Sequence, residues 1–190
     1  MSPCCGSVCL LVVLGVVVAS GNPLQYVSEN LKKDHESIAD VLKLKETEIG
    51  SNPLFSSVID SIKSQRKQEV LLMNATLDVY TRIFSSILQH NHNQHHESPL
   101  LHDLSDAEIK KNAVSALEKL QQKLQEKRND LKSCLSHLGH LSHNREDVFN
   151  KLNKIKVDDP KDQKKALAEF LEIYQAASVI HSKCSHAHSS

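Results

Sequence analysis

An all-α fold is predicted by three features of this 190-residue sequence. Apolar residues recur at intervals of three and four along most of the chain, which places them on one face of a helix. The alternating apolar and polar pattern of a half-buried strand is nearly missing. Gly and Pro number only five each, so signals that break a helix are few. Together these features indicate helices packed around one core.

Three helices are predicted in the first half of the chain. The apolar stripe of the first breaks at Asp34 and His35, where we expect the helix to give way to an irregular loop. A short second helix follows the sequence GSNP, with Asn52 as its cap and Pro53 at its first position. The third, at about 65–89, is apolar over half of its circumference, so we expect several helices to contact it.

A polar linker at 90–103 leads into a long fourth helix. Ser105 and Glu108 have the spacing of a capping box at its start. Its leucines follow a three-and-four spacing to about Leu141, which also fits a coiled-coil structural module. Lys127 interrupts that seam and the neighbouring helices are short, so we prefer a packed bundle.

Two helices close the chain, a short one at about 146–155 and a last one from Pro160 to about His181. The last helix is apolar over about half of its circumference, like the third. A compact one-chain bundle and an exchange of the last helices between two chains would bury the same surfaces. We expect exchange, because we predict that a lone chain leaves this face uncovered.

The first 21 residues predict secretion. An uncharged apolar run from Val8 to Ala19 precedes the small residues Ser20 and Gly21, which is the pattern of a cleaved signal peptide. The run is short for a membrane span, although an uncleaved anchor is the alternative. We therefore expect a signal peptide at 1–21, a helical domain at 22–181, and a disordered His-containing tail at 182–190.

Charge and motifs argue against several classes of function. Lys plus Arg and Asp plus Glu number 23 each, which gives no case for nucleic acid or for insertion into a membrane after signal removal. The chain lacks a Gly-flanked Ser, a phosphate-binding loop and a zinc-protease pattern. We predict neither an enzyme nor a cofactor.

Twelve histidines are the compositional oddity. Four of them lie in the polar linker, and imidazoles at such spacings bind zinc or copper: His90, His92, His95 and His96. A secreted His-rich metal-binding protein is therefore an alternative. We prefer the interpretation that these histidines belong to a solvated linker without a metal.

Two further features concern modification. Cys134 and Cys184 are the cysteines outside the signal segment, and in an oxidising compartment they can pair within a chain or across a dimer. A free thiol at Cys184 is the alternative. Asn74 and Thr76 form a glycosylation sequon, and the helical spacing places Asn74 on a polar face, so we predict a glycan there.

The last helix resembles the signature of the interferon gamma family. That signature is a β-branched aliphatic residue, Gln, any residue, Lys or Gln, Ala, two residues, Glu, Leu or Phe, two residues, then Ile or Val. The matching residues are Gln163, Lys165, Ala166, Glu169, Phe170 and Ile173. Asp162 occupies the aliphatic first position and departs from the pattern.

Other family-like segments occur in the family's order. They are YV at 26–27, ENLKK at 29–33, HESIAD at 35–40, LF at 54–55 and REDVFNKL at 145–152. The middle of the fourth helix matches poorly. A fish form of the cytokine often lacks the family's basic tail, and here only Lys183 gives the tail a fixed positive charge.

The resemblance implies a six-helix cytokine fold assembled as an intertwined homodimer, with each last helix packed in a cleft of the partner. It implies a secreted cytokine that crosslinks cell-surface receptors and starts kinase signalling. Carried over by position, the receptor-binding residues are His35, Ser37, Ile38, Asp40 and Glu169. Ala168 replaces the His of mammalian members, which changes the contact at that point. A monomeric four-helix cytokine is the alternative.

Overall fold

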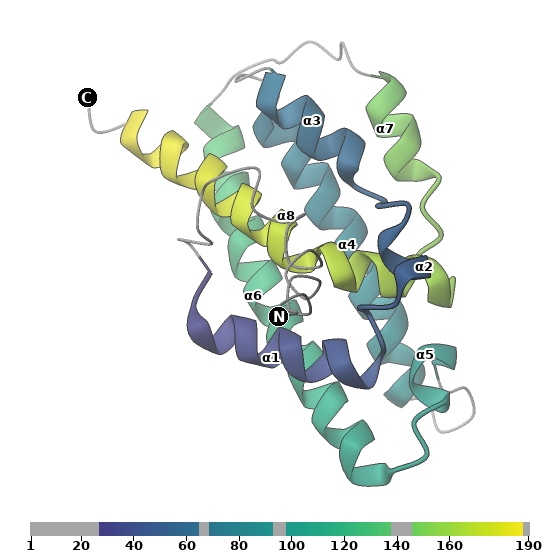
Figure 1. The fold of residues 1–190 in the computed structure, drawn as a ribbon. Helices are drawn as coiled ribbons and strands as arrows, with labels where there is room; N and C mark the ends of the chain where they lie inside the picture. The colour runs from purple at the N-terminus through teal and green to yellow at the C-terminus, as the bar shows by residue number, and fades with distance from the viewer. Residues whose placement is uncertain (1–26, 65–68, 93–97, 138–145, 188–190) are drawn as a thin grey trace, which may run out of the picture.

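The computed structural model describes residues 27–64, 69–92, 98–137 and 146–187, and within these ranges the chain is helical without a strand (Figure 1). The segments are α1 (Glu29–Val41), α2 (Thr47–Gly50), α3 (Ser56–Ser64), α4 (Glu69–His92), α5 (Pro99–His102), α6 (Ala107–His137), α7 (Glu146–Asn153) and α8 (Pro160–Ala187). The all-α prediction is confirmed. In this part of the chain six helices have eight or more residues, and α2 and α5 are single turns.

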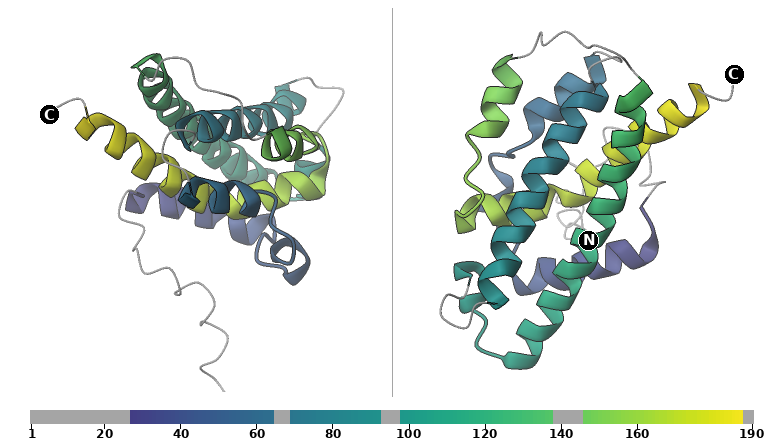
Figure 2. Two further views of the ribbon diagram at one scale, coloured as in Figure 1. Left: turned by 90° about the horizontal axis from the view of Figure 1, so that it is seen from above. Right: turned by 180° about the vertical axis from the view of Figure 1, so that it is seen from behind.

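The two longest central helices, α4 and α6, lie side by side and run in opposite directions (Figure 2). Helix α8 crosses both of them on one side, and α1 packs against α6 and α8. Helices α3 and α7 pack against α4, and α2 contacts α8. The wide apolar face of α4 is explained by this arrangement, since α3, α6, α7 and α8 all contact that helix.

The apolar face of α8 is buried within this one chain. Ala166, Leu167, Phe170 and Ala177 have no exposed surface, and Ile173 and Ile180 are 1% exposed. The hydroxyl group of Tyr80, which is also fully buried, donates a 2.9 Å hydrogen bond to the carbonyl of Ala166. The expectation that a lone chain leaves this face uncovered is therefore wrong.

Two helix boundaries differ from the prediction in the first half of the chain. Helix α1 continues through Asp34 and His35, because both side chains have partners on other helices rather than in solvent. Asn52 and Pro53 lie ahead of α3, which begins at Ser56, so Asn52 is not its cap.

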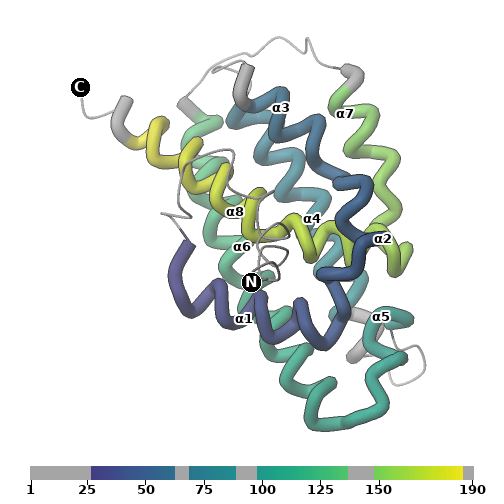
Figure 3. Tube along the Cα trace, viewed as in Figure 1, coloured from purple at the N-terminus to yellow at the C-terminus, as the bar shows by residue number. Residues whose placement is uncertain are grey.

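The predicted linker at 90–103 is also more structured than its polarity suggests. Figure 3 traces α5 between the end of α4 and the start of α6. Leu100 and Leu101, on α5, are 4% and 0% exposed and belong to the core. At the start of α6 the cap is Asp106, not Ser105, because Asp106 Oδ1 accepts the backbone N–H groups of residues 108 and 109 at 2.8 and 2.9 Å.

The predicted tail is helical over most of its length. Helix α8 ends at Ala187, so the expectation of a disordered segment at 182–190 is wrong for residues 182–187. A disulfide between Cys134 and Cys184 joins this end of α8 to α6. The predicted signal peptide at 1–21 lies outside the described residues. In the described ranges, none of the helices has the length and apolar character that a membrane crossing requires.

Candidate functional site

Four of the five carried-over receptor residues lie on α1, but they do not share one exposed face. Ser37 and Asp40 are exposed, whereas Ile38 is fully buried in the core. The helical period explains the separation, because Ile38 points toward the body of the molecule with Leu31. The prediction that Ile38 offers its side chain to a receptor is therefore wrong.

His35 faces α8 and is half-buried. Its Nε2 lies 2.8 Å from the carbonyl oxygen of Leu167, and its ring stacks on Phe170 with centroids 6.1 Å apart. Because a carbonyl oxygen only accepts, Nε2 carries the proton and donates it. Burial lowers the pKa of His35, although the bond to Leu167 opposes the shift. His35 thus links α1 to α8, with limited surface for a receptor.

The polar residues of the family signature hold loops of this chain. Gln163, 1% exposed, donates from Nε2 to the carbonyl of Val157 at 2.9 Å. Lys165, 8% exposed, donates from Nζ to the carbonyl of Asn52 at 2.8 Å. Buried amide and ammonium groups need such partners, so these two contacts fix the loops before α8 and before α3.

Glu169 extends this set of contacts. Its two carboxylate oxygens accept the backbone N–H groups of Leu54 at 2.6 Å and Phe55 at 2.9 Å, just ahead of α3. Burial raises the pKa of Glu169, and the two N–H bonds oppose that shift. A carboxylate held in this way supports α3. It is not the exposed receptor contact that the resemblance implied. We call Gln163, Lys165 and Glu169 the backbone clamp.

The apolar residues of the signature complete the core beside this clamp. Phe170 lies within an aromatic cluster, with ring centroids 6.2 Å from Tyr80, 5.8 Å from Phe84 and 6.0 Å from Tyr174. Ala166 and Ile173 lie one turn to either side of Phe170 and are buried as well. The three small and large apolar residues thus form one buried stripe along α8.

A shallow groove of about 280 Å³ separates the end of α1 from α8. Its lining residues are Lys32, His35, Glu36, Ala39, Leu44, Lys45, Ala168 and Leu171. At its edge Lys45 forms a 2.8 Å ion pair with Asp40. Ala168 lies in this groove. Of the carried-over residues, His35 lines this groove, and the exposed Asp40 lies at its edge.

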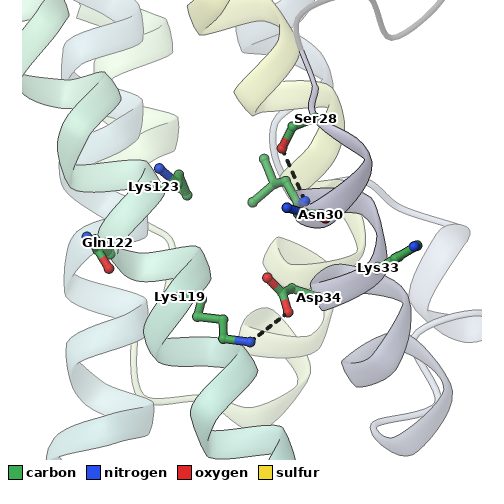
Figure 4. Close-up of a pocket in the computed structure, with 8 residues that line it drawn as sticks. Ser28, Asn30, Lys33, Asp34, Lys119, Gln122 and Lys123 are labelled. Atoms are coloured by element: carbon green, nitrogen blue, oxygen red, sulfur yellow. Dashed lines mark hydrogen bonds and ion pairs between the residues drawn. The ribbon is translucent and has the colours of Figure 1, made fainter.

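A second cleft, of about 580 Å³, lies between α1 and α6 (Figure 4). Asp34 and Lys119 point toward one another across it and form an ion pair at 3.2 Å. Lys123 pairs with Glu126 at 2.7 Å, and Lys33 points away from α6. The lysines of this cleft are therefore engaged or turned outward, and they do not converge on a common anion.

The predicted pairing of Cys134 with Cys184 occurs within this one chain. Cys134, 5% exposed, and Cys184, half-buried, form a disulfide with a Cα–Cα distance of 6.1 Å. In this single chain Cys184 is bonded to Cys134 and is not a free thiol, while pairing across a dimer stays a prediction. The bond joins two helices rather than two turns of one helix.

The glycosylation site is less exposed than predicted. Asn74 is half-buried on α4, and its Oδ1 is buried without a hydrogen-bond partner among the described residues. Thr76 is fully buried and donates from Oγ1 to the carbonyl of Leu72 at 2.9 Å. The expectation that Asn74 lies freely on a polar face is wrong, because this part of α4 faces other helices.

The histidine candidates are only partly placed. His90 and His92 belong to the last turn of α4, whereas His95 and His96 lie outside the described residues. In the described part of the chain, no group of three or more His, Cys, Asp or Glu residues could hold a metal ion. A metal site at these four histidines stays an untested alternative.

Comparison with known protein families, with curated proteins and with solved structures found no match to this chain.

Proposed function

We propose that this chain is a secreted interferon-gamma-like cytokine. It would bind and crosslink a cell-surface class II cytokine receptor, and so trigger kinase and transcription-factor signalling in antiviral and macrophage-activating immunity. The observation that carries the proposal is the ordered series of family-like segments that ends in the signature from Gln163 to Ile173.

The contacts of the signature support the proposal. Here Gln163, Lys165 and Glu169 each bond to backbone atoms of a loop, while Phe170 fills the core. A pattern in which each position has a defined structural role is what a shared fold requires.

The receptor-facing surface that we propose is the α1–α8 groove with Ser37 and Asp40. Ser37 and Asp40 are exposed beside the groove, which combines apolar surface from Ala168 and Leu171 with the charges of Glu36 and Lys45. Mixed apolar and charged surface of this kind suits a protein partner. A replacement of Asp40 should therefore weaken signalling without disturbing the core.

The proposed assembly is a homodimer with exchanged last helices. Two copies of the chain are identical, so the α8 of one copy can make every contact that the other copy's α8 makes in the closed chain. Exchange then costs little packing, while the dimer presents two copies of the α1–α8 groove. Two such surfaces on one particle would allow two receptors to be crosslinked.

The test is to treat leukocytes with the mature protein and to follow transcription-factor phosphorylation. Asp40→Lys reverses an exposed charge beside the groove and should lower the response at least several-fold. The variant should still fold, because the Asp40–Lys45 ion pair is exposed and contributes little to stability. Asp60→Lys, the same change at an exposed position on α3, is the control. Absence of a response to the unmodified protein, or equal loss in both variants, would reject the proposal.

A monomeric helical cytokine is the second candidate. The observation that favours it is the burial of α8 by its own chain. Sedimentation at nanomolar concentration distinguishes the two assemblies, because an exchanged dimer separates only when both copies of α8 leave their cores. A monomer that still evokes the leukocyte response would favour this second candidate.

A further inference from the structure

We propose that the disulfide between Cys134 and Cys184 couples the covalent state of this protein to its assembly: the chain that supplies α8 to a core also supplies Cys184 to that core's Cys134. An exchanged dimer would then carry two interchain disulfides, and a closed chain carries one intrachain disulfide that prevents exchange. The inference deepens the proposed function, since it rests on the homodimer proposed there.

The geometry starts with the places of the two cysteines. Cys134 lies near the end of α6 and is buried, and Cys184 lies near the end of α8 and packs against the core. The Cα–Cα distance of 6.1 Å is within the range that a disulfide spans. The bond therefore depends on α8 being seated along α6.

The position of α8 against the core is fixed by contacts in its first half. The backbone clamp and Phe170 fix the first half of the helix against α3, α4 and the preceding loop. Phe170 and Cys184 belong to one continuous helix, whose rise of about 1.5 Å per residue puts them roughly 20 Å apart. A rigid helix seats both ends together, so the core that receives Phe170 also receives Cys184.

Because α8 is one rigid helix, the closed chain and the exchanged dimer differ in which chain's Cys184 is bonded to a given Cys134. The intrachain bond closes a ring with a sequence separation of 50 residues, and the ring contains α7 and most of α8. If α8 moved into a partner, its Cys184 would lie beside the partner's Cys134 and far from its own. The intrachain bond must therefore open before exchange.

The other contacts at this end of α8 are weak by comparison. Lys183 Nζ lies 3.5 Å from a carboxylate oxygen of Glu69, and His181 Nδ1 lies 3.8 Å from Asp130. The Lys183 side chain is 55% exposed, although that of Glu69 is only 7% exposed, and the long 3.5 Å and 3.8 Å separations make both contacts weak. The disulfide is thus the strongest attachment of this end to its core.

The conversion is electron-neutral. In each of two chains a small-molecule thiolate attacks the Sγ of Cys184, breaks the bond to Cys134 and forms a mixed disulfide, and Cys134 leaves as a thiolate. After the two α8 helices have exchanged, the Cys134 thiolate of each core attacks the mixed disulfide of the incoming Cys184, forms an interchain bond and releases the small thiolate. Two interchain bonds replace the two intrachain bonds, and both small thiolates are recovered.

The first experiment uses isotopes to read the linkage. Unlabelled and ¹⁵N-labelled mature chains are mixed equally, refolded together in a glutathione redox buffer and separated into monomer and dimer. Non-reducing digestion and mass spectrometry then identify the linked Cys134 and Cys184 peptides. We expect mixed-isotope pairs in the dimer and single-isotope pairs in the monomer. A dimer with only single-isotope pairs would overturn the inference.

A second experiment covers the case in which the oxidised chain stays monomeric. The double variant Cys134→Ser, Cys184→Ser removes the lock, and circular dichroism checks that its helices have formed. We expect this variant to dimerise, because nothing covalent then holds α8 in its own core. If it also stays monomeric while retaining its helices, the lock has no assembly to control and the inference is wrong. If it does not fold, the folded unmodified chain is reduced with excess thiol instead, and a reduced chain that keeps its helices and stays monomeric overturns the inference.

The leukocyte response separates this inference from the proposed function. A dimer with mixed-isotope pairs that evokes no response keeps the disulfide inference and rejects the cytokine. A response to a monomer whose double variant never dimerises keeps a cytokine and rejects the disulfide inference.

Discussion

The two halves of α8 are attached to the molecule in different ways. Residues 160–173 are held by many directed contacts: the backbone clamp bonds three polar side chains to loops, and Phe170 fills an aromatic cluster. Residues 174–187 have buried apolar positions at Ala177 and Ile180, but their last turns depend on one disulfide, on the Lys183–Glu69 ion pair and on a contact between His181 and Asp130.

This difference shows that the first half of α8 is positioned by specific packing, whereas the attachment of the second half depends on a disulfide. The contacts of the first half form whenever the helix meets its core, whichever chain supplies it. The disulfide of the second half forms only in an oxidising compartment and can be exchanged by a thiol. Packing therefore defines where α8 fits, and the covalent bond defines how long it stays there.

The largest effect is expected from Phe170→Ala in the first half. Phe170 is fully buried among four aromatic rings, so its truncation leaves a cavity and should lower the free energy of unfolding by about 3–5 kcal/mol. Chemical denaturation measures the change. Leu171→Ala, at a partly buried neighbouring position, is the control and should cost clearly less. Equal losses would show that the aromatic cluster is not the anchor of this half.

The second effect concerns the disulfide. Replacing both Cys134 and Cys184 by Ser should lower the free energy of unfolding by about 2–4 kcal/mol, because the unfolded chain is no longer a closed ring. Amide hydrogen exchange should rise mainly in residues 174–187, where the bond is the principal attachment. An equal rise along the whole helix would contradict the division of α8 into two differently held halves.

The third effect tests the backbone clamp. Glu169→Ala leaves the N–H groups of Leu54 and Phe55 without their acceptor, which should cost about 1–3 kcal/mol of unfolding free energy. Glu169→Gln keeps one acceptor oxygen and should cost less. Glu172→Ala, an exposed position three residues on, serves as the control. If the Glu169 and Glu172 variants unfold alike, the carboxylate does not support α3.

The apolar pattern of the sequence predicted the buried face of α8 well. Leu167, Phe170, Ile173 and Ile180 follow the helical period, and all four are buried. The period is a local property, so it survives whatever surrounds the helix. The same reasoning predicted the wide contact surface of α4, which several helices cover.

The predictions that were wrong concern polar residues whose partners lie far away in the sequence. Asp34 and His35 interrupt the stripe of α1, yet Lys119 is 85 residues from Asp34 and Leu167 is 132 residues from His35. Glu169 likewise supports backbone 114 residues away, at Phe55. Local spacing carries no record of such pairs, so a polar residue with a distant partner looks like a break or an exposed contact.

The smallest effect is a pH dependence at His35, which connects α1 to the first half of α8. Burial lowers the pKa of His35 in the folded chain, so the folded state binds a proton less tightly than the unfolded state does. Stability from this group is therefore present above the unfolded value, about 6.5, and is lost as the pH falls toward the lowered folded value. Of its neighbours, Glu36 opposes this shift and Lys45 adds to it.

The matched variant is His35→Gln, which can still donate to Leu167 but does not titrate. Denaturation midpoints at pH values of about 7.5 and 5.5, on either side of the histidine range, measure the loss on acidification. We expect the unmodified chain to lose more than the variant. The pKa of Glu169 is raised and acts in the opposite direction, but it does so in both proteins and cancels in the difference. Parallel losses would mean that His35 is not the group through which acid loosens α1 from α8, and that the first half of this helix is held independently of α1.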